Sequence, residues 1–413
     1  MKIGSFAKKF NASIDTIRYY TNFGLLIPVK KDSYYEYDQT CEEDMKIITE
    51  LKSFEFTLNE IRNILDLKRI TLLRDHEDLN LYVQLLERKK EEISLEISKL
   101  HLALQKIDKK IDLLCQKNHN ETVTGLSFSF LRFLRCPLCT GSFQLENALI
   151  QNESLIDASI QCACGYHADI RQGILFAPSL DNSTQNIAYL YEQKTLGEMS
   201  TELIQIIEKC SLFTYQKLRD LDLSHKVIFE PCIDTFVFLP KYIHLLPDDA
   251  YYIFCGSNEE MIVKLKSKID SINPALKVLY IVNSSLHLPV ATNSIDFLID
   301  SLSFNDYALF NNVFPLSKLT SLCKEKAMII GCFAYHKQGA KSLRKLKELY
   351  PNAYSNNAEK DFIKANINTY SFEFEETFPI GETKEPGIYI EYHVENETMF
   401  FEGYIGRRMT KHS

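Results

Sequence analysis

The sequence has neither a run of 18 apolar residues nor an excess of basic side chains. Without such a run we expect no membrane-spanning segment, and the N-terminal MKIGSFAKKF lacks the apolar stretch of a signal peptide. The net charge of −8 excludes a positive field over the whole protein, although a local basic face remains compatible with nucleic-acid binding. The motifs GxSxG and HExxH and the Walker phosphate loop are also absent. These absences favour a cytoplasmic protein whose function lies in other motifs.

Two short helices are predicted at the start of the chain. Apolar side chains recur at helical spacing from Ile3 to Phe10, and the pattern then breaks at Asn11 and Ala12. Ser13 is of a type preferred at a helix N-cap, and it opens the segment SIDTIRYY. Two short helices joined by a tight turn form a helix-turn-helix unit, whose second helix enters the major groove of DNA. Taken alone, TIRYY is better explained as a core helix with a few exposed aromatic side chains.

The segment VKKDSYYEYD, which follows GLLIP, predicts a short β-ribbon beside the groove. Its lysines can meet phosphates, and its tyrosine hydroxyls can donate hydrogen bonds to them. A further pair of helices is predicted at 41–54 and 57–68. With the ribbon and this pair in order, the pattern favours DNA binding over a core helix. The predicted DNA-binding residues are Ser13, Thr16, Arg18, Tyr19, Tyr20, Lys30, Lys31, Tyr34, Tyr35 and Tyr37.

The order of these pieces closely resembles the MerR family of transcription regulators. The resemblance rests on IGSFAKKFNASIDTIRYYTNFGLLIP, YYEYD and FTLNEIRNIL. It implies a winged helix-turn-helix domain that binds a palindromic promoter in double-stranded DNA as a dimer and distorts it so that RNA polymerase can engage. The family's wing usually carries a Tyr-Arg pair, whereas this chain has Tyr34-Tyr35. A charged phosphate contact is therefore missing, which changes the expected affinity or site preference.

A seven-residue apolar repeat begins at residue 79. One row consists of Leu79, Leu86, Ile93, Leu100, Ile107 and Leu114, and the other of Val83, Lys90, Ile97, Leu104 and Ile111. Two rows at this spacing are typical of a coiled-coil seam, in which the single polar residue Lys90 would fix register and oligomeric state. The sustained period favours a coiled coil over a helix packed on its own chain. MerR proteins dimerise through an antiparallel coiled coil at this position, so the resemblance implies a homodimer.

Four of the eleven cysteines are clustered as two pairs, Cys136 with Cys139 and Cys162 with Cys164. In a reducing compartment such pairs favour metal over disulfides, and four thiolates complete a tetrahedral, structural zinc site with no open position. The second pair has one spacer residue where two are usual, so His167 is an alternative fourth ligand. Four reduced cysteines without metal are the other alternative. The segment also resembles the zinc ribbon that precedes the catalytic domain of some ribosomal RNA guanine methyltransferases.

The C-terminal half alternates apolar runs with helical or loop segments. The runs are VIFE, YYIFC, KVLYIV, IDFLID and AMIIGCF, and further strands are expected near 388–394 and 399–406. Such alternation predicts an α/β fold with a mostly parallel sheet. The order and spacing resemble class I S-adenosylmethionine-dependent methyltransferases across residues 185–410, with Glu230 ending the first strand and LPVATNSIDFLID as the most specific match. The resemblance implies a Rossmann-like methyltransferase fold.

The turn after the first of these strands lacks the glycines typical of a methyltransferase cofactor site. In EPCIDTF, Cys232 and Phe236 stand where the family has glycines, which permit positive φ and close approach of a ligand. The second strand ends in FCGS without the ribose-binding acid, and serine replaces the acid expected after the third. The absence of two charged hydrogen bonds, of about 1.5–3 kcal/mol each, weakens binding about a hundredfold or more. Glu230 remains as a candidate cofactor-binding residue, although it and Asp300 are expected to be solvated loop carboxylates.

These observations predict a multidomain protein. An all-α winged helix-turn-helix domain at 1–72 precedes a coiled-coil dimerisation helix at 76–118, a small β zinc ribbon at 126–180 and a methyltransferase-like α/β domain at 185–413. The leading hypothesis is a homodimeric, DNA-binding transcription regulator with structural Zn2+, whose degenerate C-terminal domain is a sensor or interaction module. The alternatives are an active methyltransferase that uses S-adenosylmethionine and is targeted by its DNA-binding head, and a scaffold that binds no small molecule. No catalytic residue is assigned.

Overall fold

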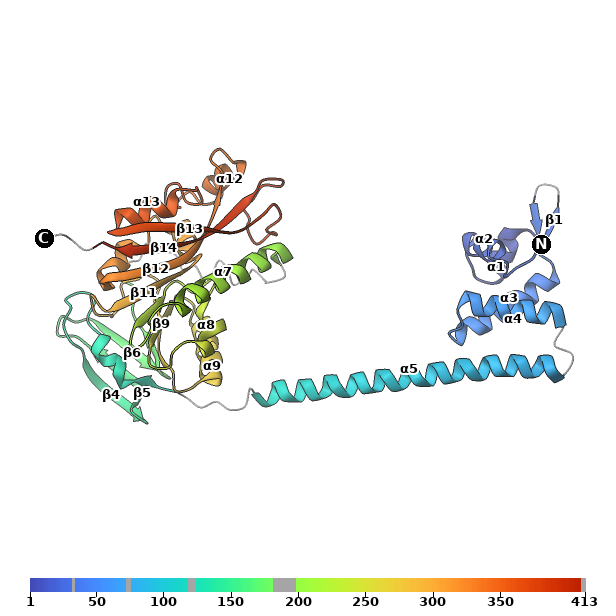
Figure 1. Cartoon of the computed structure of the whole chain (residues 1–413), viewed down its shortest axis with the longest axis horizontal. Helices are drawn as coiled ribbons and strands as arrows, with labels where there is room; N and C mark the ends of the chain where they lie inside the picture. The colour runs from blue at the N-terminus through green and yellow to red at the C-terminus, as the bar shows by residue number, and fades with distance from the viewer. Residues whose placement is uncertain (32–33, 72–75, 118–123, 181–197, 410–413) are drawn as a thin grey trace. The chain divides into compact units, whose positions relative to one another are not determined.

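The computed structural model describes residues 1–31, 34–71, 76–117, 124–180 and 198–409, and Figure 1 shows their helices and strands. The chain divides into two compact units, Met1–Gln116 and Lys117–Ser413. Each unit has its own cluster of buried hydrophobic side chains. In the part of the chain that the structure describes, no helix is long and apolar enough to cross a membrane.

The first unit combines helices with one antiparallel ribbon. Its elements are α1 (Ile3–Lys9), α2 (Ile14–Asn22), β1 (Val29–Lys31), β2 (Tyr34–Glu36), α3 (Gln39–Ser53), α4 (Leu58–Thr71) and α5 (His76–Lys117). The ribbon pairs Lys30 with Tyr35 and Lys31 with Tyr34. Phe6 of α1 is fully buried in the core that the helices of this unit share.

Like α3, which begins at the Asp38 cap, the helices α2 and α4 begin at side-chain caps. The Ser13 hydroxyl accepts a hydrogen bond from the backbone N–H of Thr16 at 3.0 Å, which satisfies one of the free donors in the first turn of α2. A capping box opens α4, since the Thr57 N–H donates to the Glu60 carboxylate at 2.7 Å and the Glu60 N–H donates back to the Thr57 hydroxyl at 3.4 Å. Both caps follow from the local sequence.

Arg69 of α4 fastens the end of the helix-turn-helix to the second helical pair. Its guanidinium donates to the carbonyl oxygens of Gly24 at 3.1 Å and Leu25 at 2.6 Å. It also pairs with the buried carboxylate of Asp44 on α3 at 2.7 Å. The loop after α2 is thereby held against α3 and α4, which sets the position from which the ribbon starts.

The second unit begins with a small antiparallel sheet. Its elements are β3 (Leu126–Ser127), the 3-10 helix η1 (Phe128–Phe133), β4 (Gln144–Gln151), β5 (Ser154–Gln161), β6 (His167–Arg171) and β7 (Ile174–Phe176). The strand β5 pairs with β3, β4 and β6, and β6 pairs with β7. The strand β7 then pairs in parallel with β10 (Lys277–Val282), so the small sheet is continuous with the sheet of the α/β part.

The α/β part is a seven-stranded portion of that sheet with helices between its strands. Its remaining strands are β8 (Val227–Glu230), β9 (Tyr251–Gly256), β11 (Ile295–Ser301), β12 (Cys323–His336), β13 (Phe372–Thr383) and β14 (Met399–Arg408). The helices are α7 (Thr201–Arg219), α8 (Leu239–Tyr242), η3 (Ile243–Leu245), α9 (Glu259–Ile272), α10 (Ser303–Phe310), α11 (Leu316–Leu319), η4 (Thr320–Leu322), α12 (Lys341–Leu349) and α13 (Phe362–Thr369).

The strands follow the order β13-β14-β12-β11-β8-β9-β10. Strands β8 to β12 pair in parallel, whereas β14 runs antiparallel to both of its neighbours. Every residue of β8 and β9 is buried, which explains why both read as continuous apolar runs in the sequence. The order reverses between β8 and β11, and ligands of open α/β sheets bind at such a reversal, outside the carboxyl ends of the strands.

The edge of the sheet differs from the sequence prediction. The strand expected near 388–394 is absent, and these residues form turns. The edge strand is instead β13. Its glutamate-rich sequence does not show the apolar pattern of a strand, because most of its residues are exposed or half-buried. Gly387 has a φ of +89° and forms an isolated bridge to Met199, and this turn redirects the apolar segment that follows it. The other expected strand, 399–406, falls within β14.

Candidate functional site

The helix α2 and the ribbon border a hollow of about 400 Å³ on the surface of the first unit. It is lined by Lys2, Ile3, Arg18, Thr21, Asn22, Tyr34, Tyr35 and Tyr37. Arg18 is exposed on α2 and pairs with Asp15 at 3.1 Å. Tyr19 is 52% exposed beside it and stacks on Phe23 with ring centroids 5.7 Å apart. A cation and an aromatic ring therefore project together from the helix that is expected to enter a groove.

The ribbon presents its predicted residues to solvent. Lys30 and Lys31 of β1 are exposed, as are Tyr34 and Tyr35 of β2. The Lys31 ammonium pairs with Glu36 at 3.2 Å. Because Lys30 lies directly opposite Tyr35 in the ribbon, a positive charge is available next to the position where the family's wing carries arginine. Ser13 and Thr16 complete this surface at the start of α2, where their hydroxyls share a hydrogen bond of 2.8 Å.

Two of the predicted DNA contacts are core residues, and the prediction is corrected for them. Tyr37 is 1% exposed, because its ring stacks on Phe6 at 4.7 Å and its hydroxyl shares a hydrogen bond with Thr21. Tyr20 is 4% exposed, and its hydroxyl accepts a hydrogen bond from Lys52 at 3.2 Å. Sequence alone could not separate them from their exposed neighbours, because Tyr19 and Tyr20 are adjacent on α2 and Tyr34, Tyr35 and Tyr37 are close together in and after β2, with no sign of which ring packs inward.

The four clustered cysteines converge in the small sheet. Their sulfur atoms all lie within 4.8 Å of one another, with Cys136 and Cys164 3.4 Å apart and Cys139 and Cys162 3.3 Å apart. Zn–S bonds of about 2.3 Å in a tetrahedron place sulfurs about 3.8 Å apart, so this set is arranged as a metal site requires. Such separations also exclude S–S bonds, which are about 2.0 Å. The cluster can therefore bind a metal ion.

The short spacing of the second cysteine pair is accommodated by a tight turn. Gly165 has a φ of +91°, and its N–H donates to the Cys162 carbonyl oxygen at 2.9 Å. The backbone N–H of Tyr166 lowers the pKa of the Cys164 thiol to about 7, which favours the thiolate that metals bind. The alternative ligand His167 is exposed at the start of β6 and is not part of the cysteine group.

The carboxylates at the switch point are buried, which corrects the expectation that they are solvated. Glu230 is fully buried and accepts hydrogen bonds from the N–H groups of Phe238 at 2.5 Å and Leu239 at 3.1 Å. Burial outweighs these bonds and raises the pKa of Glu230 to about 7. Asp300 is also fully buried and accepts from the N–H of Phe304 at 2.9 Å and the hydroxyl of Tyr404 at 2.8 Å.

The turn after β8 keeps a glycine-like backbone without glycine. Cys232 has a φ of +55°, the left-handed region that favours glycine, and its side chain is buried. Asp234 was not singled out in the sequence, yet its carboxylate accepts from the N–H of Ser257 at 2.7 Å and of Asn258 at 3.0 Å. It thus reaches the end of β9, where a methyltransferase would place its ribose-binding acid. The only sequence signal was an acid in a turn that lacks glycine.

These residues do not fit S-adenosylmethionine as the family binds it. Glu230 and Asp234 both direct their carboxylates at backbone N–H groups of the protein, and the Cys232 side chain occupies the position where a glycine would leave space. In the described part of the chain, no acid stands at the end of β9 to hold ribose hydroxyls. The strand order and the turn's backbone therefore match the fold, while the side chains do not match the ligand.

The helix pair α1 and α2, followed by an antiparallel ribbon and a second helix pair, defines a winged helix-turn-helix, a class of DNA-binding domain. Residues 1–68 match the model of the MerR HTH family regulatory proteins, so this part of the chain is a MerR-family domain and the resemblance is confirmed. An HTH-type transcriptional regulator, ZntR homolog, of Haemophilus influenzae is 29% identical over 111 residues, which cover 26% of this chain and 79% of that protein.

Solved structures match both units. The transcription regulator PbrR691 from Ralstonia metallidurans CH34, in complex with lead(II), is 23% identical at a TM-score of 0.24 and covers 26% of this chain and 83% of that chain. An S-adenosylmethionine-dependent methyltransferase from Aquifex aeolicus is 11% identical at a TM-score of 0.34, covering 51% of this chain and 100% of that chain. The strand order, with its single antiparallel strand β14, is by itself that of a Rossmann-like methyltransferase fold.

Replacing Arg18 with alanine should remove the preference of the protein for its DNA site. Loss of one arginine contact should weaken specific binding by about 1–3 kcal/mol, or roughly 5- to 150-fold. Gel shifts should use a duplex that the wild-type protein selects from a random pool, at fixed salt. Arg88→Ala is the matched control, because Arg88 is 78% exposed on α5 and also pairs with an acid of its own helix, Glu92. An Arg18→Ala shift equal to that of the control would contradict the assignment.

Proposed function

We propose that the protein is a dimeric, DNA-binding transcription regulator of the MerR type. The observation that carries this proposal is the hollow in which Arg18 of α2 meets Tyr34 and Tyr35 of the ribbon, within a MerR-family domain whose ribbon also exposes Lys30 and Lys31. In this arrangement α2 reads the major groove and the ribbon holds the adjoining phosphates. By analogy with the family, the bound dimer distorts a promoter so that RNA polymerase can engage it.

The helix α5 supplies the dimer contact in this proposal. Both rows of its seven-residue repeat present apolar side chains to solvent in the single chain, among them Leu79, Val83, Ile97, Leu100, Leu104, Ile107 and Ile111, each more than 40% exposed. Soluble monomers rarely expose a contiguous apolar stripe of this length. The occupant that fits best is α5 of a second copy, because a two-fold dimer matches a palindromic DNA site.

A lysine at position 100 should dissociate this dimer. Leu100→Lys would bury a charge in the seam, whereas Ser98→Lys adds the same charge two residues away, outside both rows. Mass measured by light scattering during gel filtration should fall to that of one chain for Leu100→Lys and stay at two chains for Ser98→Lys. Equal masses for the two variants would refute a dimer formed through this seam.

The cysteine cluster holds a structural zinc ion in the proposal. Four sulfur ligands, two from each turn, leave no position open for a substrate or water. The site belongs to the small sheet, which joins the α/β sheet through the pairing of β7 with β10. The metal would therefore stabilise the region next to the α/β core. Thiolate chemistry and the tetrahedral spacing of the sulfurs favour zinc over a hard cation.

The zinc content of single-residue variants should show whether the fourth ligand is a cysteine or His167. The purified wild-type protein should contain about one zinc per chain, as one four-ligand site requires. Cys162→Ser should lose most of this zinc, and because the metal contributes to folding, thermal unfolding should begin at a lower temperature. His167→Ser, the matched control on the same hairpin, should retain it. Retention of zinc by Cys162→Ser together with its loss from His167→Ser would assign the fourth ligand to the histidine.

The C-terminal domain acts in this proposal as a sensor or interaction module and not as a methyltransferase. The carboxylates of Glu230 and Asp234, which lie where an active enzyme handles its cofactor, are satisfied by the protein's own backbone. An active methyltransferase targeted by the DNA-binding domain is the second candidate, because the strand order is retained. The buried Cys232 side chain in the turn weighs against that candidate.

S-adenosylmethionine should fail to bind the zinc-loaded, full-length protein. Because the chain lacks two of the acids with which the family holds the cofactor, the Kd should exceed roughly a millimolar. Calorimetric titration should show no heat of binding, and thermal unfolding should be unchanged by the compound. Micromolar binding would show instead that the turn accepts the cofactor without glycine, and a methyl-transfer assay on DNA and RNA would then decide between enzyme and sensor.

A further inference from the structure

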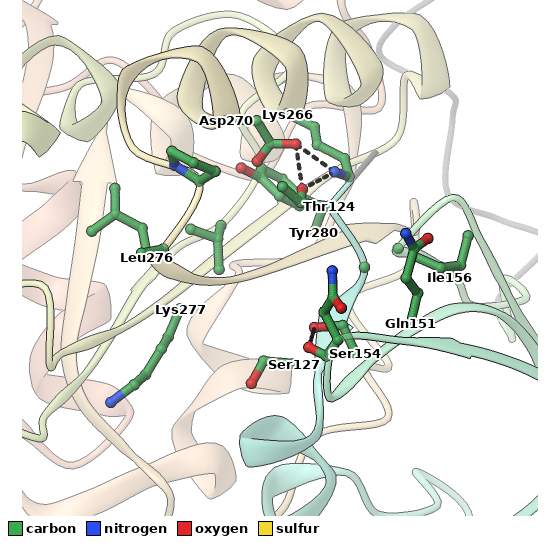
Figure 2. Close-up of a pocket in the computed structure, with 16 residues that line it drawn as sticks. Thr124, Ser127, Gln151, Ser154, Ile156, Lys266, Asp270, Leu276, Lys277 and Tyr280 are labelled. Atoms are coloured by element: carbon green, nitrogen blue, oxygen red, sulfur yellow. Dashed lines mark hydrogen bonds and ion pairs between the residues drawn. The ribbon is translucent and has the colours of Figure 1, made fainter. Parts of the chain in front are cut away.

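The second unit also has a hollow, which lies where the small sheet meets α9 and β10 (Figure 2). Its volume is about 430 Å³, within the range of small-molecule sites. One wall comes from β3 and the β4–β5 hairpin, and the other comes from the segment between α9 and β10. It is distinct from the switch point, because none of its lining residues belongs to the turns after β8 or β9.

The two walls differ in chemistry. The small sheet contributes hydroxyl and amide groups, from Ser127, Gln151, Asn152 and Ser154. The opposite wall contributes carbon surface, from Pro274, Ala275, Leu276 and Val278. A molecule with a polar and an apolar side would therefore satisfy both walls, as small-molecule sites generally require.

The least exposed charged residue of the lining is Lys266, which is only 8% exposed. Its ammonium lies 2.5 Å from the carboxylate of Asp270 and also donates to the Thr124 hydroxyl, which itself bonds to Asp270 (Figure 2). An ammonium carries three N–H donors, so one donor is left without a partner among the described residues. The ammonium of Lys277, the other lysine of the lining, lies instead 4.9 Å from the centre of the Tyr251 ring and 3.4 Å from the Asp249 carbonyl oxygen, so Lys266 is the cation that the hollow can offer to a ligand.

Tyr280 provides the second unused group. It is 2% exposed, and its hydroxyl has no hydrogen-bond partner in the described part of the chain. Burial raises the pKa of Tyr280, so the hydroxyl is protonated at neutral pH and can donate. The Lys266 ammonium lies 5.8 Å from the centre of its ring. A buried polar group without a partner destabilises the protein unless a ligand or water supplies one.

We propose that this hollow binds a small organic carboxylate, whose oxygens accept hydrogen bonds from Lys266 and Tyr280 and whose carbon skeleton rests on Leu276. Both unused groups are hydrogen-bond donors and one of them is an ammonium, which selects an acceptor-rich anion. The apolar wall favours an organic anion over inorganic phosphate, because phosphate has no carbon surface to bury. Binding of a carboxylate here would give the proposed sensor role a ligand. Only the effect of that ligand on transcription rests on the proposed function, because the binding site itself does not involve DNA.

The test is thermal unfolding and calorimetry of the full-length, zinc-loaded protein with succinate, citrate and L-glutamate, each at about 10 mM, tenfold above a millimolar Kd. At least one should raise the unfolding temperature. Tyr280→Phe removes only the unused hydroxyl, so the free variant should be at least as stable as wild type. Its affinity for the same carboxylate should fall about tenfold or more, as the loss of one hydrogen bond to a charged group predicts.

Tyr166→Phe is the matched control, because the Tyr166 hydroxyl is also buried without a partner in the described residues but does not line this hollow. It should bind the carboxylate as wild type does. The proposal is overturned if no carboxylate binds, if Tyr280→Phe binds as tightly as Tyr166→Phe, or if inorganic phosphate alone gives a Tyr280-dependent shift. Because none of these measurements contains DNA, their failure is separable from failure of the regulator proposal.

Discussion

The parallel pairing of β7 with β10 is the contact on which the second unit depends. It places Ile174 beside Tyr280 and joins the cysteine-bearing sheet to the α/β sheet, so one hydrophobic core spans both. Gly173, with a φ of +75°, permits the close approach before β7, since a side chain there would collide with the Thr124 carbonyl oxygen. The polar wall of the hollow exists only because this pairing sets the small sheet beside α9. Metal site, hollow and Rossmann-like core are therefore parts of one body.

At the switch point, two carboxylates serve the protein's own backbone. The acid at the end of β8 and the acid of the following turn each accept hydrogen bonds from nearby backbone N–H groups. A buried carboxylate without partners would destabilise the protein strongly, so these bonds make Glu230 and Asp234 compatible with a closed interior. Glu230, which suggests a cofactor site in the sequence, and Asp234 thus both act as internal caps of loops.

Local signals in the sequence predicted most of the architecture. The MerR resemblance and the multidomain fold class are confirmed, because caps such as Ser13, the ribbon and the run of parallel strands depend on neighbouring residues. Distant contacts could not be predicted. The pairing of β7 with β10, the glutamate-rich edge strand β13 and the burial of Tyr37 each depend on what packs against a segment from far along the chain. For the switch-point site, the sequence predicted which residue types are present, but not that the Glu230 carboxylate is buried in the interior of the protein.

The attachment of Thr124 to α9 stabilises the start of the small sheet. Thr124 follows Lys117, the last residue of α5, by seven positions, and its hydroxyl bonds to both Lys266 and Asp270. The next strand, β3, has only two residues, so few ladder hydrogen bonds hold it to β5. The two hydrogen bonds of Thr124 hold the chain to α9, a helix that packs against the central strands β9 and β10. The attachment therefore limits fraying of β3, because the residue two positions before the strand is held by α9.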